Sequence, residues 1–525
     1  MGIYVNPGNE NFTAALAEEI FVDKSLILQK FYKVLNTRSS KFICVSRPRR
    51  FGKSIVRDLM VAYFSKGCDS KKLFSKLKIA KKPNFEKSIN KFNVISIDLG
   101  AVFSSSKNRN EIISNLYNKL LEDFRDEFPD IEFSENDSIA DLIMKAYKYT
   151  GIQFVIIIDE YDVLVREQIS TDIFKEYLEL LNSLFKNNEL SPAIALAYLT
   201  GILPIVRDKI QSKLNVFKES TMLDPMGFEN FFGFTKTETK ALCKKYKMSF
   251  KECENWYDGY KIGKTSVYNP NSVVNAMMDR KYRNYWNITG SYEVISEYVK
   301  LNFDGIKSDV VDMITGKEIA VNPIGFLNSL DYFNNKDDVF TYLIHLGYLN
   351  CNEETKLCRI PNREIKEEWE KALGRAGNFA KIAEMIADSD KLLYLAQNGE
   401  SKEVATALDK AHTEVSSVLN YNFESSLQAA IILAFYTART KYTIIQELPA
   451  GYGFADIGFI PINKKDPAMI IELKCNYDAD TAIKQIKNKN YPVAFENYLD
   501  NLLLVAVNYD KKTKVHECII EKYQK

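Results

Sequence analysis

A run of five apolar residues from Phe154 to Ile158 ends directly in two carboxylates, Asp159 and Glu160. Four of the five are β-branched, which is typical of a strand buried on both faces of a parallel sheet. Acids at the end of a buried strand are costly unless they have partners or a chemical role. Because ligands bind beyond the carboxyl ends of parallel strands, the pattern predicts an α/β fold with a binding site at this edge.

The segment SRPRRFGKS at residues 46–54 has the chemistry of a phosphate-binding loop. A short apolar run precedes it and apolar residues at helical spacing follow it, so Gly52, Lys53 and Ser54 lie where a strand turns into a helix. The N-terminus of that helix offers unpaired N–H groups and a positive dipole to an anion. Lys53 can reach the β- and γ-phosphates of a nucleotide, and the Ser54 hydroxyl can ligate Mg²⁺.

Three arginines crowd this loop, and the first of them, Arg47, stands where the pattern G-x-x-x-x-G-K-[ST] has a glycine. Three like charges repel one another at such spacing unless an anion or an acid lies among them. We expect at least one of them to contact phosphate; the alternative is that all three are solvated or pair with acids. The residues predicted to bind the nucleotide are Arg49, Arg50, Phe51, Gly52, Lys53, Ser54, Asp159 and Thr200.

The two segments together predict binding of ATP or GTP with Mg²⁺. Asp159 is expected in the magnesium shell beside Ser54, and Glu160 is the candidate catalytic group that polarises an attacking water. Thr200 follows the next apolar strand, where it either senses the γ-phosphate or simply ends the strand. Arg207 is a candidate finger for the nucleotide of its own or a neighbouring subunit, which leaves a homo-oligomer open.

Apolar strands alternate with helical patterns through the first 200 residues, which indicates a parallel sheet. We expect helices over 11–37, 55–65, 108–126, 138–150 and 172–187, and strands over 41–45, 93–100, 154–158 and 193–199. Beyond about residue 235 the aromatic cluster of Trp256, Tyr257 and Tyr260 fits the packing of a small lid better than a ligand site. The predicted domains are a parallel-sheet domain over 1–234, a helical lid over 235–300, a mainly helical middle region over 301–397 and a second α/β domain over 398–525.

A second constellation lies in an apparent hairpin near the C-terminus, made by FADIGFIP at 454–461 and AMIIELKC at 468–475. Residues two apart in a strand point the same way, so the hairpin can bring Asp456, Glu472 and Lys474 together. Two carboxylates can hold a divalent ion that polarises a phosphodiester, and the lysine can neutralise the charge that develops. The plain alternative is a surface ion pair between Glu472 and Lys474.

Two further residues flank this hairpin. Glu424 opens a predicted helix upstream and can add a ligand, and Gln485 lies on a basic helix downstream. The whole chain carries 70 basic and 69 acidic residues, so its net charge indicates neither a nucleic acid nor a membrane. Affinity for nucleic acid would rest on local clusters such as Lys484, Lys487 and Lys489.

The composition excludes several protein classes. Eight cysteines are scattered without a C-x-x-C pair, and with three histidines no zinc-site spacing is present. The longest apolar stretch, 193–206, is shorter than the roughly 18 residues that a membrane-spanning helix needs. Because the N-terminus also lacks the features of a signal peptide, we expect a cytoplasmic protein with reduced thiols and no membrane partner.

At this point the chain resembles the bacterial AAA-ATPase-like proteins that are fused to a domain of the PD-(D/E)XK nuclease superfamily. The resemblance covers nearly the whole chain and rests on specific motifs: RPRRFGKS, DEYD, LTGIL at 199–203, WYDGY with VYNP at 256–270, and the terminal ADIGF…IELK…Q pattern. It implies a P-loop domain of the AAA/RecA-like type, a helical middle and a restriction-endonuclease-like α/β domain. In that family an arginine-rich loop replaces the first glycine, so Arg47 follows the family.

The resemblance also implies roles for individual residues. It supports nucleotide binding by Gly52–Ser54 with Asp159 and Glu160 as the acidic pair. In the C-terminal domain it implies metal ligands at Asp456 and Glu472, a catalytic lysine at Lys474, and accessory catalytic roles for Glu424 and Gln485. Phe454 departs from the pattern, which has a polar or basic residue at this position, and that leaves contact with the substrate backbone there in doubt.

Three hypotheses of function follow. The first is an ATP-binding and ATP-hydrolysing protein that regulates an attached nuclease acting on nucleic acid, DNA ahead of RNA. Its cofactors would be ATP and Mg²⁺, with Mn²⁺ as an alternative at the nuclease site. The second is a nucleotide-dependent switch or scaffold whose nuclease-like domain binds nucleic acid without cleaving it. The third is a protein that binds ATP without turnover.

Overall fold

The computed structural model divides the chain into two compact units. The first comprises Met1–Thr289 and Ala320–Ile365, and the second comprises Gly290–Ile319 and Lys366–Lys525. The residues that the structure describes are 2–106, 108–167, 169–205, 215–286, 306–314, 316–324, 326, 333, 335–375, 380–416, 424–463 and 465–524. The middle region expected over 301–397 is thus shared between the two units. The bounds of the four predicted domains remain a prediction.

Five parallel strands form the main sheet of the first unit, in the order β2-β3-β4-β1-β5. Their bounds are β1 (Phe42–Ser46), β2 (Asn93–Asp98), β3 (Phe154–Asp159), β4 (Ile194–Gly201) and β5 (Lys218–Ser220). β3 is buried along its whole length, as its apolar run predicts. The strand register sets Asp98 beside Asp159 and Asp159 beside Thr200, so these polar residues share the carboxyl edge of the sheet.

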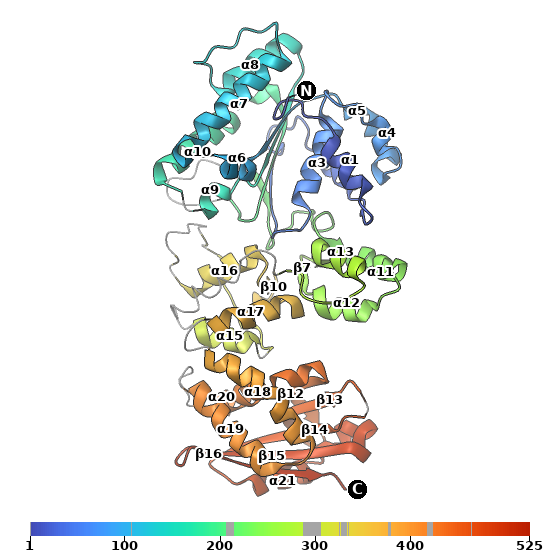
Figure 1. Cartoon of the computed structure of the whole chain (residues 1–525), viewed down its shortest axis with the longest axis vertical. Helices are drawn as coiled ribbons and strands as arrows, with labels where there is room; N and C mark the ends of the chain where they lie inside the picture. Colours follow the sequence, from blue (N-terminus) through green and yellow to red (C-terminus); the bar gives the residue numbers. More distant parts are fainter. Residues whose placement is uncertain are drawn as a thin grey trace. The chain divides into compact units, whose positions relative to one another are not determined.

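Helices cover both faces of this sheet, as a sheet of buried parallel strands requires (Figure 1). One face carries α1 (Glu10–Ala17), α2 (Leu28–Tyr32), α3 (Lys53–Phe64), α4 (Lys71–Phe74) and α5 (Phe85–Ser88). The other carries α6 (Leu99–Ser105), α7 (Ile112–Glu127), α8 (Ile139–Thr150), α9 (Val163–Arg166) and α10 (Thr171–Phe185). The predicted helices 55–65, 108–126, 138–150 and 172–187 match α3, α7, α8 and α10.

The single helix expected over 11–37 is wrong. α1 ends at Ala17, residues 18–24 are not helical, and the chain re-enters a 3₁₀ turn at Ser25–Ile27 before α2. Glu18 and Glu19 follow α1 directly. Negatively charged side chains are unfavourable at the C-terminus of a helix, because this end of the helix dipole is itself negative. Asp23 then accepts a hydrogen bond from the Ser25 N–H at 2.8 Å, which starts the next turn.

The segment predicted to be a lid has its own core. It comprises β6 (Phe234–Thr235), α11 (Lys236–Lys245), α12 (Phe250–Tyr257), β7 (Tyr260–Ile262), β8 (Thr265–Tyr268) and α13 (Pro270–Asp279), and β6, β8 and β7 form a small sheet. Trp256 and Tyr257 are buried in the core of this lid, which confirms the expected packing role. Further along the chain lie α16 (Lys336–Leu346), β10 (Asn350–Cys351), β11 (Leu357–Arg359) and the start of α17 (Arg363–Arg375).

The second unit is built on a mixed sheet with the order β12-β13-β14-β15-β16. Only β14 and β15 run parallel, and α21 makes the crossover between them. The strands are β12 (Tyr442–Ala450), β13 (Gly453–Pro461), β14 (Ala468–Cys475), β15 (Leu502–Asp510) and β16 (Val515–Lys522). The helices are α15 (Ile306–Ile314), α18 (Ala380–Gln397), α19 (Ser401–Ser416), α20 (Glu424–Ala434), α21 (Ala479–Asn488) and the 3₁₀ helix η9 (Tyr491–Asn501), and the short strand β9 (Ile319–Ala320) ends the segment after α15.

The expected fold class is confirmed: an α/β chain with an N-terminal parallel sheet, a helical middle and a C-terminal mixed sheet. The predicted hairpin of β13 and β14 is also present, with antiparallel pairing. Within the part of the chain that the structure describes, no helix combines the length and the apolar character needed to cross a membrane.

Candidate functional site

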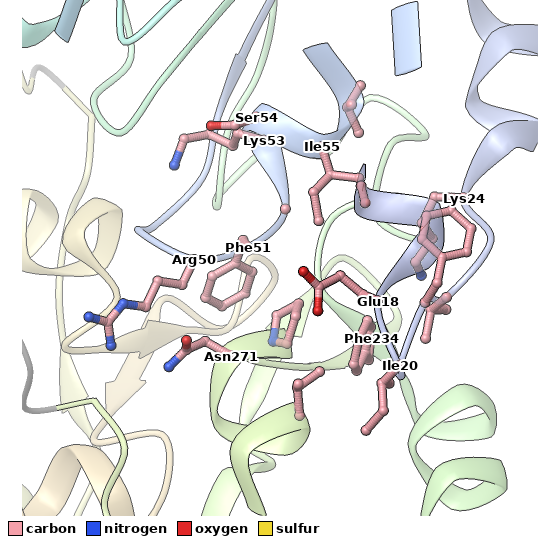
Figure 2. Close-up of a pocket in the computed structure, with 18 of the residues that line it drawn as sticks. Glu18, Ile20, Lys24, Arg50, Phe51, Lys53, Ser54, Ile55, Phe234 and Asn271 are labelled. Carbon is pink, nitrogen blue, oxygen red and sulfur yellow. The ribbon is translucent and has the colours of Figure 1, made fainter. Parts of the chain in front are cut away.

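A pocket of about 600 Å³ opens in the first unit where β1 turns into α3 (Figure 2). Its polar end is lined by Gly52, Lys53, Ser54 and Asp159, the residues that the sequence predicts to meet phosphate and magnesium. α3 begins at Lys53, so the unpaired N–H groups and positive end of this helix meet the pocket here. The structure therefore brings the two predicted segments into one wall.

The opposite end of the pocket is apolar. It is lined by Ile20 and Phe21 from the non-helical segment after α1, by Phe234 at the start of β6, and by Val274 and Met278 on α13. Figure 2 shows Ile20 and Phe234 away from Lys53 and Ser54, on the side of the pocket where Glu18 and Lys24 also lie. Sequence reasoning missed this wall, because its parts join only through the tertiary fold. The local sequence gave one signal that the helix ends here: two acids, Glu18 and Glu19, are followed by three consecutive apolar residues, which cannot all lie on one face of a helix.

The loop itself holds the geometry that a phosphate needs. Gly52 has a φ of +88°, and no atom lies within 4 Å of where a side chain would begin, so the backbone is open to a ligand. The Lys53 ammonium donates to the carbonyl oxygens of Arg47 and Pro48, each at 2.9 Å. Burial lowers the pKa of Lys53 to about 8, and the nearby acids, Asp159 first, oppose this shift. The ammonium is thus held against the loop by groups that an anion can replace.

Asp159 is almost fully buried and surrounded by donors. Its Oδ2 accepts from the Arg57 guanidinium at 3.1 Å and its Oδ1 from the Glu160 N–H at 3.0 Å. Burial raises the pKa of Asp159, while Arg57 and a hydrogen bond from the Ser54 hydroxyl pull that pKa down. Because the Ser54 hydroxyl and the carboxylate adjoin, the two residues fit the oxygen ligands that Mg²⁺ takes in nucleotide sites.

Arg57 is a residue of this site that the sequence analysis missed. Its guanidinium contacts Asp98 at 2.7 Å, Asp58 at 2.9 Å and Asp159, so it compensates three acids at the sheet edge. A signal was present, since Arg57 lies three residues after Ser54 and therefore on the same side of the helix.

Glu160 lies at the pocket wall in a left-handed conformation, with a φ of +50°. Such a backbone is unfavourable for a residue with a side chain and is often found at functional positions. Its carboxylate accepts from Arg166 at 2.9 Å and is partly exposed. The last acid of the DEYD motif has a different task, because Asp162 is buried and accepts from the N–H groups of Ile202 and Leu203.

Thr200 is not among the residues that line the pocket. It is fully buried in β4, and its hydroxyl donates to the carbonyl of Val45 at 3.1 Å. Its role as a γ-phosphate sensor stays a prediction. Arg207 lies outside the described residues, so its role as a finger stays a prediction as well.

The loop arginines divide between two roles. Arg47 is fully buried and donates to the carbonyl of Ser220 at 3.1 Å and to its hydroxyl at 2.9 Å, which ties the loop to β5. Arg50 donates to the carbonyl of Tyr285 at 3.0 Å, and the Phe51 ring packs edge-on against Tyr260 at 5.2 Å. The remaining one, Arg49, is exposed and lines the pocket. The expected phosphate contact therefore falls to Arg49 more than to Arg47.

The second unit brings together three residues of the predicted hairpin. The Glu472 carboxylate is buried within β14 and accepts from the Lys474 ammonium at 3.0 Å. Asp456 on the facing strand accepts from the Leu473 N–H at 2.7 Å. Burial raises the pKa of Glu472 to about 7, with the charge of Asp456 as the second cause. Two acids close enough to raise a pKa in this way are typical of metal sites and of catalytic pairs.

The accessory residues lie beside this group. The Gln485 amide, on α21, donates to Glu472 Oε1 and to the Tyr491 hydroxyl. Glu424 is the first residue of α20, one turn before Gln428, whose amide donates to the carbonyl of Asp456 at 3.0 Å. The catalytic roles of Glu424 and Gln485 remain predictions.

A metal ion fits this second site in one respect that the structure makes visible. Glu472 Oε1 has two donors, whereas Oε2 is buried and has no hydrogen-bond partner among the described residues. An unpaired buried carboxylate oxygen is costly, and a cation would satisfy it. No group of three or more His, Cys, Asp and Glu side chains converges in the described part of the chain, so Asp456 and Glu472 would be the carboxylate ligands there.

Comparison with known proteins gives a separate family match in each of the two units. Residues 8–211 match the family model of a predicted AAA-ATPase, and residues 422–518 match that of the PD-(D/E)XK nuclease superfamily. Over 356 residues the chain is 23% identical to a protein of Azotobacter chroococcum mcd 1 described as an uncharacterized protein in the vnfD 5′ region. That match covers 63% of this chain, which spans 62% of the length of the relative.

A solved structure of the Aeropyrum pernix ORC2 protein, in ADPNP–ADP complexes, is also similar over 66% of this chain and 92% of its own. The identity is 11% and the TM-score is 0.25, so this likeness carries no argument.

Restoring the glycine of the general loop pattern should harm this protein. Arg47→Gly removes the hydrogen bonds to Ser220 and leaves polar groups unpaired in the interior, so the free energy of unfolding should fall by about 2–4 kcal/mol. Arg49→Gly, at an exposed position of the same loop, should cost less than about 1 kcal/mol. Chemical denaturation of the full chain measures both. Equal stability of the two variants would show that Arg47 has no anchoring role.

The unpaired Glu472 oxygen predicts a pH-dependent effect of metal on stability. A cation must displace a proton from Glu472 below its pKa of about 7, so affinity should fall about tenfold for each pH unit below that value. Millimolar Mn²⁺ should therefore raise the thermal unfolding midpoint of the full chain by a few degrees or more at pH 8 and by less at pH 6. Glu472→Gln should remove the difference. A Mn²⁺ effect that is the same in this variant would place the ion elsewhere.

Proposed function

We propose that this chain, which matches the predicted AAA-ATPases over residues 8–211 and the PD-(D/E)XK nuclease superfamily over residues 422–518, binds and hydrolyses ATP and regulates an attached metal-dependent nuclease. The nuclease would act on nucleic acid, with DNA as the first candidate. The proposal that one activity controls the other rests on the presence of both domains in one chain.

One observation carries the ATPase half of the proposal. A single pocket joins a polar end, formed by the start of α3, Lys53 and Asp159, to an apolar end formed by residues such as Ile20 and Phe234. A nucleoside triphosphate has the same division, because its phosphates are charged and its base is flat and largely apolar. The pocket volume of about 600 Å³ lies within the range of small-molecule sites.

The residues of the first unit suit hydrolysis as follows. Lys53 leaves the carbonyl oxygens of the loop and neutralises the β- and γ-phosphates, and the N–H groups of α3 hold the same phosphates. Asp159 and Ser54 would hold Mg²⁺, which supplies charge neutralisation between the phosphates when it is bound. Glu160 takes the role of the group that orients an attacking water, for which its carboxylate must turn away from Arg166.

The residues of the second unit suit phosphodiester cleavage. Asp456 and Glu472 would hold Mg²⁺ or Mn²⁺, which supplies Lewis-acid polarisation of a phosphate oxygen when it is bound. Lys474 lies 3.0 Å from Glu472 Oε1 and is placed to meet the charge that develops on the phosphate. Gln485 donates to the same oxygen and helps to fix the Glu472 carboxylate.

Two variants separate nucleotide binding from turnover. Lys53→Ala removes a charge-assisted contact worth about 1.5–3 kcal/mol, so it should bind ATP at least about tenfold more weakly. Glu160→Gln keeps the shape of the site and should bind ATP normally while phosphate release is lost. Equilibrium binding of a fluorescent ATP analogue and a phosphate-release assay test the pair. Normal turnover in Glu160→Gln would mean that another residue orients the water.

A matched cleavage assay tests the nuclease half. Linear and single-stranded DNA would be incubated with Mg²⁺ or Mn²⁺, with and without ATP, and with wild type or Lys474→Ala. Cleavage should require the metal, respond to ATP and disappear in Lys474→Ala, while the ATPase activity of this variant is unchanged. Metal-independent binding without cleavage in any condition would favour the scaffold hypothesis instead. Cleavage at the same rate with and without ATP would reject the proposed regulation and leave the proposed nuclease activity in place.

A further inference from the structure

An aromatic turn, defined here as residues 451–454, comprises the two residues that join β12 to β13 and the first two residues of β13, and it exposes two large rings to solvent. Tyr452 is 82% exposed and Phe454 is 63% exposed. Phe454 is the only exposed phenylalanine among the residues that the structure describes. Leaving two large rings in water forgoes the stabilisation that their burial would give, so this turn is costly to the free protein. Two large exposed rings within three consecutive residues are typical of a surface that binds a ligand.

The aromatic turn is connected to the candidate nuclease site by a short chain of contacts. The Tyr452 N–H donates to the Lys489 carbonyl at 2.8 Å, so the turn rests on the end of α21. A side chain on Gly453 would lie 3.4 Å from the Tyr491 hydroxyl. That hydroxyl accepts from Gln485, whose amide also donates to Glu472. The rings therefore lie a few contacts from the Glu472 carboxylate, and Phe454 is two residues from Asp456 on β13.

Positive charge accompanies the rings. The Lys489 side chain passes beside Gly453, with its ammonium 3.5 Å from where a side chain on Gly453 would begin. Lys484 is exposed one turn earlier on α21, whereas Lys487 is engaged by Glu521 at 2.6 Å. Exposed rings with ammonium groups on the neighbouring helix suit a ligand that has flat faces and a negative backbone.

A third exposed aromatic residue lies beyond Lys474. Tyr477 is 69% exposed, and its backbone is fixed by Asn508 through two hydrogen bonds, of 3.1 Å and 2.8 Å. It follows the end of β14, the strand that carries Glu472 and Lys474. The candidate site is therefore flanked in sequence by exposed rings on both of its strands.

We infer that the aromatic turn is a stacking platform for unpaired bases, and that the second unit takes single-stranded nucleic acid. This inference rests on the proposed nuclease function and names its substrate class. Bases in a duplex cover one another's faces, so an exposed ring can reach a face only where the strand is unpaired. A phenyl ring has no group that can hydrogen-bond a phosphate, so Phe454 cannot serve as a contact to a duplex backbone.

Binding measured without any divalent ion tests the inference apart from cleavage. Labelled oligo(dT), oligo(rU) and a hairpin duplex of matched length would be titrated with the full chain in EDTA, with fluorescence anisotropy as the readout. Phe454→Ala should weaken single-strand binding by about fivefold or more. Phe454→Leu, which keeps apolar bulk without a ring, should weaken it as well, and Phe454→Trp should bind as wild type. Loss with either oligonucleotide supports the inference and names the sugar.

The control is Tyr394→Ala on α18, because Tyr394 is 65% exposed in the same unit and is not part of the turn. It should bind all three probes as wild type. Lys489→Gln should reduce the slope of affinity against salt concentration by about 0.7 for the single strands. Single-strand binding by Phe454→Ala within twofold of wild type would overturn the inference.

Two other outcomes also overturn it. An equal loss on the duplex would mean that the ring is a wedge between paired bases. A changed oligomeric state of Phe454→Ala in sedimentation, with unchanged binding, would make the turn a protein contact. Because no step of the test requires cleavage, an inactive nuclease would leave the inference intact, and a nuclease that is insensitive to Phe454 would leave the proposed function intact.

Discussion

Both candidate sites depend on an acid that is held on a buried strand, out of contact with water. Asp159 is the last residue of β3 in the first unit, and Glu472 lies within β14 in the second. A buried carboxylate must be paired or protonated, because its desolvation costs several kcal/mol. The rest of each site can be understood as the means by which that cost is met.

The two units meet this cost differently. Asp159 is compensated inside the protein by Arg57, which also binds Asp58 and Asp98. Glu472 has Lys474 and Gln485 on one oxygen only, and its pKa is raised to about 7. The first acid is therefore stable as an anion without a ligand. The second is poised between its charged and protonated forms until a cation or a proton reaches it.

Local pattern predicted those parts of the fold whose residues carry their own signal. The apolar run of β3, the Gly-Lys-Ser turn at the start of α3 and the β13–β14 hairpin were all predicted from spacing and composition. The single helix predicted over 11–37 is wrong, because α1 ends at Ala17 and the apolar residues on either side of this point pack against different surfaces. Ile20 and Phe21 therefore became pocket residues that a periodicity argument assigns to a helix face.

Distant partners account for most of what the sequence could not show at the sites. Arg47 is next to a phosphate-binding motif, and only its contact with Ser220, 173 residues later, reveals an anchoring role. Arg57 gave a weak signal through its spacing from Ser54, but its acids come from three different elements. A polar or basic residue was expected in place of Phe454, and the exposure of its ring to solvent could be seen only in the structure.

Lid and loop are also joined more closely than the aromatic motifs suggested. Tyr260 donates to the carbonyl of Gly347 at 2.8 Å and packs against Phe51, next to the lysine of the loop. A side chain on Gly347 would come within 3.0 Å of Pro48, so the loop and the segment after α16 touch with no room to spare. A shift of the phosphate-binding loop would therefore displace Tyr260 and the lid segment that carries it.

The strand order has a consequence for the newly made chain. β1 lies between β4 and β5, and the Arg47 anchor needs Ser220, so the loop cannot take its final shape until residue 220 has left the ribosome. At about 5–20 residues per second, this delay is roughly 10–35 s. Throughout that interval the loop lacks its contact with Ser220. Because the pocket is lined by residues up to Met278 and the second sheet begins only at Tyr442, the pocket of the first unit can form while the strands of the second unit are still to be synthesised.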